Sequence, residues 1–138
     1  MKGQSEIITP AEKAALLRKA IEQFNAGQYF DQHETFEHLW RNTPSPERDA
    51  YQAILQVGVA YLHIQNKNWD GAKKVLDRAI PKLQKLPNEY AGINLAQLLT
   101  DAQVVRNALE NNEAVELKPI VGHWLLVNPD QDPSTNTQ

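Results

Sequence analysis

The sequence predicts an all-α protein: an antiparallel bundle of about five helices arranged in hairpins, with an extended C-terminal tail. Three observations predict it. Apolar residues recur at the spacing of a helix face in five consecutive stretches. Start and stop signals for helices separate these stretches. The apolar pattern of the first hairpin also recurs 40 residues later in the second.

The first two helices are defined by their ends. Thr9 is expected as an N-cap, with Pro10 at the first helical position and Glu12 completing a capping box. Gly27 ends this first helix. The second helix is expected at about residues 29–42.

Three further helices are expected, at about residues 46–66, 69–86 and 95–111. The third is apolar almost all round, as core helices are, and its Gly58 either weakens the helix or permits a close neighbour. In the fourth, Trp69 is expected to fill the core and Pro81 to kink the chain. Asn94 is expected to cap the fifth.

The chain after residue 111 loses the long helical period. Residues 115–127 are expected to be extended and to lay Ile120 and Trp124 back on the bundle. The last residues are polar and contain two prolines, which favours disorder. We therefore expect a loose arm at 1–8, a single helical domain at 9–127 and a disordered tail at 128–138.

The repeated pattern predicts two helix hairpins with tetratricopeptide-like packing. Tyr29 of the first hairpin corresponds to Trp69 of the second. The other corresponding sets are Leu17, Ala20, Ile21 and Phe24 in the first hairpin, and Val57, Ala60, Tyr61 and Ile64 in the second.

Composition restricts the classes of function. The 138 residues carry a net charge of -3, which argues against general nucleic-acid binding. The absence of cysteine excludes disulfides, thiol catalysis and iron–sulfur ligation. No signal peptide or membrane-spanning run is recognisable, so we expect a cytoplasmic protein with no membrane partner.

Two polar residues stand out on the second helix. At about 100° per residue, its packing side is expected to carry Tyr29, His33, Phe36, Glu37 and Trp40. An imidazole and a carboxylate are unexpected on such a face, because buried polar groups are costly unless they are paired. The sequence therefore predicts a paired polar site at this helix.

The stretch from Phe24 to Arg41 resembles the opening of a prokaryotic family named domain of unknown function 309. The family pattern F-N-x-G-x-Y-F-x-x-H-E-x-x-E-x-x-W is filled here at each fixed position. The resemblance extends over about residues 12–110. It implies an all-helical bundle, and it assigns no activity because the family has none.

The polar site has two non-enzymatic interpretations. In one, the residues form a closed structural network between the second and third helices, which would allow them to be buried. In the other, they form a shallow pocket for a small ligand or a peptide, with Tyr29, Trp40 and Arg41 at its rim. The expected network consists of His33, Glu37, Gln52, Gln56 and His63.

The alternative is a metal-dependent hydrolase. His33-Glu34-x-x-Glu37 is similar to the zinc-hydrolase motif H-E-x-x-H, with a carboxylate in place of the second histidine. His33, Glu37 and His63 would then hold a transition metal such as zinc, with Glu34 as the catalytic base. Whether the protein is an enzyme is left open. The sequence favours a binding or interaction module for a protein or small-molecule ligand, with a homodimer through the third or fifth helix as a further alternative.

Overall fold

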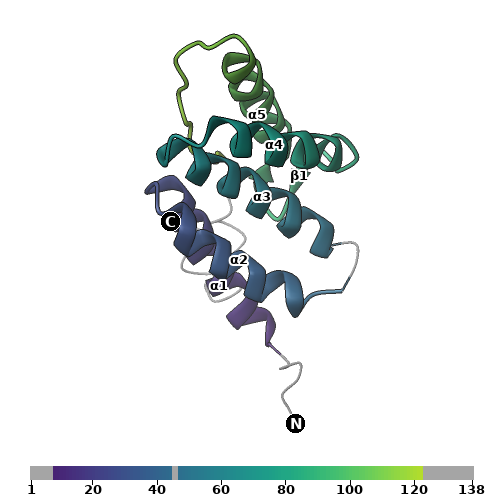
Figure 1. Cartoon of the computed structure of the whole chain (residues 1–138). Coiled ribbons are helices and arrows are strands. Elements are labelled where there is room, and N and C mark those ends of the chain that lie inside the picture. The colour runs from purple at the N-terminus through teal and green to yellow at the C-terminus, as the bar shows by residue number, and fades with distance from the viewer. Residues whose placement is uncertain (1–7, 45–46, 123–138) are drawn as a thin grey trace, which may run out of the picture.

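The computed structural model describes residues 8–44 and 47–122. Within them it contains five α-helices and one short β-hairpin (Figure 1). The all-α fold class is therefore confirmed. The elements are α1 (Pro10–Asn25), α2 (Tyr29–Arg41), α3 (Glu47–Gln65), α4 (Trp69–Gln84), β1 (Glu89–Tyr90), β2 (Ile93–Asn94) and α5 (Leu95–Glu110).

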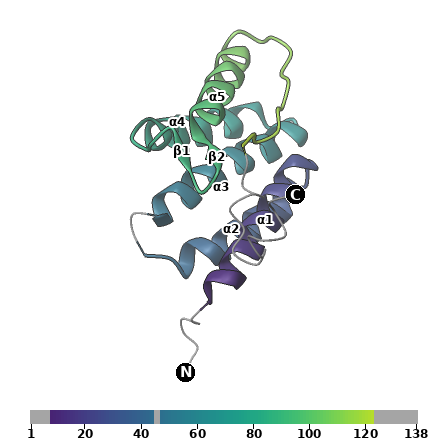
Figure 2. The same cartoon turned by 180° about the vertical axis from the view of Figure 1, so that it is seen from behind.

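Each helix packs on the next along the chain, so that α3 lies between α2 and α4 (Figures 1 and 2). None of the helices in the described ranges is long and apolar enough to span a membrane. The expected loose arm at 1–8 falls almost entirely outside the described residues, and Trp124 and the 128–138 tail lie wholly outside them.

The expected caps are present. The Thr9 hydroxyl accepts a hydrogen bond from the Glu12 amide at 3.1 Å, and the Glu12 carboxylate accepts one from the Thr9 amide at 2.9 Å. Asn94 caps α5 by accepting from the Gln97 amide at 2.9 Å. The helix α4 continues through Pro81 to Gln84.

The two hairpins have the same turn, displaced by 40 residues. Gly27 and Lys67 both adopt left-handed backbone angles, with φ of 79° and 61°. The next amide donates back into the preceding helix each time: Gln28 to the Gln23 carbonyl at 2.9 Å, and Asn68 to the His63 carbonyl at 2.8 Å. The repeat expected from the sequence is thus present in the backbone.

A third copy of this turn follows α5, but no helix follows the turn within the described residues. Asn112 has φ 56°, and the Glu113 amide donates to the Ala108 carbonyl at 2.8 Å. Residues 113–121 are not helical, and the chain loops away from the end of α5 before it returns to the bundle (Figures 1 and 2). In the part of the chain that the structure describes, the third hairpin therefore lacks a second helix.

The β-hairpin was not expected from the sequence. Its turn residues Ala91 and Gly92 have φ of 51° and 82°, the pair of left-handed residues that a tight hairpin turn requires. Ile93 forms a bridge with Gly122, and the Asn94 amide donates to the Val121 carbonyl at 2.9 Å. This hairpin consequently holds the returning segment.

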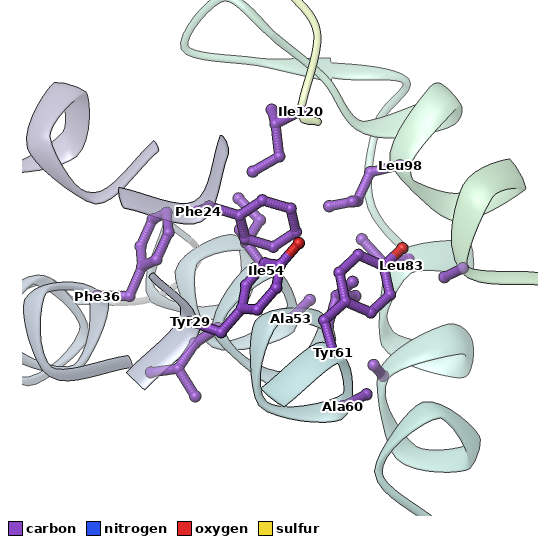
Figure 3. Packing of buried hydrophobic residues seen from close by; sticks show 14 of the residues in the cluster. Phe24, Tyr29, Phe36, Ala53, Ile54, Ala60, Tyr61, Leu83, Leu98 and Ile120 are labelled. Carbon is purple, nitrogen blue, oxygen red and sulfur yellow. The ribbon is translucent and has the colours of Figure 1, made fainter. Parts of the chain in front are cut away.

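Aromatic rings from the first three helices form the centre of the core (Figure 3). Tyr29 packs edge-on against Phe24 and Tyr61, with ring centroids 5.3 and 5.5 Å away. Ile120 from the returning segment is buried on this core, as expected. Its backbone is held by Asn25, whose side chain accepts from the Ile120 amide at 2.8 Å and donates to its carbonyl at 3.2 Å.

Candidate functional site

The buried polar residue of α2 is Gln32, and the expected central position of His33 is wrong. Gln32 is fully buried beside Phe36 and Leu39, whereas His33, Glu37 and Trp40 are half-buried at the flank of the helix. The face is displaced because α2 packs between α1 and α3, with Thr35 reaching Gln23 of α1 at 2.7 Å.

Gln32 fits because α3 has a glycine opposite it. Its amide nitrogen donates to the Tyr29 carbonyl at 3.0 Å and reaches the Leu55 carbonyl at 3.5 Å. A side chain on Gly58 would overlap the Gln32 amide. Gln32 is therefore the close neighbour that the glycine at position 58 allows.

Three members of the expected polar network have partners outside the network. Glu37 accepts from Arg41 at 3.1 Å, and Gln56 accepts from Lys82 at 3.3 Å. His63 contacts the Asn68 side-chain amide at 3.1 Å. Gln52 is half-buried on α3. Among the described residues, no hydrogen bond joins His33, Glu37, Gln52, Gln56 and His63 to one another.

The expected rim residues lie in three different environments. Tyr29 is in the core, where burial raises its pKa. The Trp40 ring has the Arg48 guanidinium 5.0 Å from its centroid, and Arg41 is exposed. The three residues therefore differ in burial and in their contacts.

The described residues contain no group of three or more histidine, aspartate or glutamate side chains that could hold a metal ion. The alternative metal centre of His33, Glu37 and His63 is therefore not formed. Glu34 is exposed on α2. The geometry gives the hydrolase interpretation no support.

The expected core position of Trp69 is also wrong. Its side chain is 48% exposed, whereas its counterpart Tyr29 in the first hairpin is 5% exposed. Trp69 lines a cavity of about 320 Å³ whose apolar wall includes Ile64, Leu109 and Val115. The cavity lies where the chain leaves the third turn without forming a helix. The helix α5 has no aromatic residue to cover the indole as Tyr61 of α3 covers Tyr29.

Comparison with known proteins finds a family model that matches part of the chain. A family model described as "Domain of unknown function (DUF309)" matches residues 17–75. The resemblance to this family is confirmed. The DUF309 match covers most of α1, all of α2 and α3, and the start of α4 with Trp69. It ends before α5, the helix that completes the cavity wall.

Two curated relatives are similar over longer stretches. An uncharacterized protein of Aquifex aeolicus is 24% identical over 109 residues, which is 78% of this chain and 33% of the relative. The uncharacterized protein YpuF of Bacillus subtilis is 32% identical over 89 residues, which is 62% of this chain and 51% of the relative. The chain thus spans about a third and about half of these two relatives, and neither has an assigned function.

Sequence reasoning missed the residues that form this cavity. The sequence favours a core position for Trp69 because tryptophan is mostly buried on average. The helical spacing places Leu109 on the packing face of the fifth helix, and the role of Val115 depends on where the chain goes after Asn112. The available signal was the loss of helical period after residue 111, which leaves the third hairpin incomplete.

Proposed function

We propose that this chain is a binding module that holds a segment of a partner protein, with one apolar side chain of the partner inserted beside Trp69. The half-exposed indole at an apolar-walled cavity of about 320 Å³ carries the proposal. Concave sites of this size with aromatic and aliphatic walls are typical of ligand recognition. Covering apolar surface releases about 25 cal/mol for each Å² removed from water.

The repeat architecture supports the same proposal. In the first hairpin Tyr29 is covered by Phe24 of α1 and Tyr61 of α3. In the second hairpin Ile64 of α3 and Leu109 of α5 line the cavity beside Trp69. A partner side chain that rests on the indole would complete the packing that the first hairpin completes internally.

The charge of Glu113, which lines the cavity, favours a partner with a basic residue next to its apolar one. The Arg106 guanidinium donates hydrogen bonds to the carboxylates of Asp77 and Glu110, each at 2.8 Å. Lys73 lies 3.8 Å from Asp70. Glu113 lines the cavity, is exposed, and has no ion pair with a described residue. Its carboxylate is therefore available to a lysine or arginine of the partner. We propose that this module acts in the cytoplasm, as the sequence leads us to expect.

The test is a peptide selection. A random peptide library is selected on the parent protein, and the affinity of the recovered peptides is measured by fluorescence polarisation. We expect peptides that share an aliphatic or aromatic residue next to a basic one. Trp69→Ala should weaken their binding about tenfold or more, as the loss of a central aromatic anchor does in interfaces.

Phe30→Ala is the matched control. Phe30 is the other half-exposed aromatic residue near a helix start, at 57% exposure, and it does not line the cavity. Its loss should leave peptide affinity unchanged. Recovery of peptides without a shared apolar residue, or equal binding by Trp69→Ala and the parent, would contradict the proposed function.

A further inference from the structure

A second cavity, of about 280 Å³, lies between α5 and the extended segment 114–118. It adjoins Ala114 and Val115, as the Trp69 cavity does, but its other walls are different. Its polar lining includes Gln97, Asp101, Glu116 and Lys118. The peptide-binding function proposed above does not use these residues.

Asp101 is the unusual member of this lining because it is an acid inside the protein. Its side chain is 6% exposed, and it accepts one hydrogen bond, from the Gln97 side-chain amide at 2.9 Å. It forms no ion pair with a described residue. A carboxylate has about four acceptor positions, and buried carboxylates are normally paired with a cation.

No cation pairs with the Asp101 carboxylate from the side that faces the protein core, among the described residues. Tyr61 lies near it, fully buried, with a hydroxyl that has no hydrogen-bond partner among the described residues. Burial, with the negative charge of Asp101 as a second cause, raises the pKa of this tyrosine. The remaining direction from which a cation can reach Asp101 is the cavity.

We propose that this cavity binds an organic cation with a primary ammonium group on an aliphatic stem. The ammonium would pair with the Asp101 carboxylate, and the stem would lie along Val105 and Ala108, which are both buried. Glu116 lines the other wall, on the extended segment, and offers a second carboxylate to a diamine. The one cation of the lining, Lys118, is exposed and leaves the two carboxylates with a net charge of -1.

The probe is 1,4-diaminobutane, titrated into the full chain by calorimetry at constant ionic strength. We expect one binding site in the parent and a loss of affinity of about tenfold or more in Asp101→Asn, because a hydrogen bond to a charged group is replaced by one to a neutral group. Asparagine can still accept from Gln97, so the fold should be kept. Asp49→Asn removes an equal charge from an exposed position of α3 and should bind as the parent does.

NMR chemical shifts of backbone amides provide a second test of binding, and this test needs only the parent protein. Saturating diamine should shift the amide signals of Gln97, Asp101 and Val105, and uncharged 1,4-butanediol should not. The inference is overturned if the parent shows neither heat nor shifts, if Asp101→Asn binds as tightly as the parent, or if Asp49→Asn is weakened equally.

Discussion

The amide of Gln32 lies directly against the backbone of Gly58, where α2 packs on α3. A Cβ atom on Gly58 would be 2.7 Å from the Gln32 side-chain oxygen and nearer still to the amide carbon and nitrogen. Gln32 cannot easily move away, because it is fully buried and its nitrogen is bonded to the Tyr29 carbonyl. The glycine in the middle of α3 is therefore required by the glutamine of α2.

Gly58→Ala should destabilise the protein by about 1–3 kcal/mol, the usual cost of overpacking a core. The sign is informative because alanine otherwise stabilises a helix interior by roughly 0.5–1 kcal/mol relative to glycine. The free energy of unfolding in urea, compared with that of the parent, measures the effect.

The control for this change is the same substitution in a Gln32→Ala background. With the long side chain removed, Gly58→Ala should become neutral or stabilising. If it costs as much in that background as in the parent, the glycine is needed for another reason and the assigned contact is wrong.

Lys67→Gly should stabilise the protein by roughly 0.5–1 kcal/mol, because glycine adopts the left-handed conformation without the strain of a Cβ atom. Gly27→Ala should cost a similar amount. A Cβ at Gly27 would meet its nearest neighbour, the Gln65 side chain, at an ordinary 3.6 Å, so only the backbone angle opposes it. Thermal melts of the two variants should shift in opposite directions, and shifts of the same sign would contradict the equivalence of the two turns.

Asn25→Ala should release the returning segment from the bundle. The two hydrogen bonds between Asn25 and the Ile120 backbone join residues 95 positions apart. Their loss should speed hydrogen exchange at the Ile120 amide and at the Asn94 amide, which bonds Val121. Asn42→Ala removes a local bond to the His38 carbonyl and serves as the control. Unchanged exchange at Ile120 would show that Asn25 does not hold the segment.

Asp77→Asn should lower stability at neutral pH, and this loss should vanish in acid. The hydrogen bond from Arg106 lowers the pKa of Asp77 below its ordinary 3.8. A lowered pKa means that the stabilisation is present above the ordinary value and is lost as pH falls through the folded-state pKa. Because Asp77 is exposed, the loss at neutral pH should be at most about 1 kcal/mol. Urea denaturation of both proteins across pH 2–7 would show the difference narrowing below about pH 4, and a constant difference would contradict the assigned pair.

Much of the fold could be predicted from sequence because its signals are local. The Thr9 cap, the Gly27 stop and the helical spacing of apolar residues depend on neighbours within a turn or two. The β-hairpin could not be predicted in the same way, since Ala91 adopts a left-handed angle that its sequence does not favour. Its two-residue strands depend on Gly122, which is distant in the chain.

The site was harder to predict because exposure depends on what packs from outside the helix. Gln32 and His33 are adjacent, and only the approach of α3 at Gly58 decides which of them is buried. Trp69 has the same helical position as Tyr29, but α5 brings no aromatic ring to it, whereas α3 brings Tyr61 to Tyr29. Asp101 falls at the edge of the apolar face of α5, where helical spacing alone does not determine burial.

The most direct test of the proposed binding site is the fluorescence of Trp69 in a variant where Trp40 and Trp124 are phenylalanine. In the free protein the indole should emit as a water-exposed tryptophan and be quenched by acrylamide, because 48% of its side chain is accessible. A saturating selected peptide should shift the emission to shorter wavelength and protect the indole from quenching. Unchanged emission and quenching with the peptide bound would show that the partner segment does not occupy the cavity at Trp69.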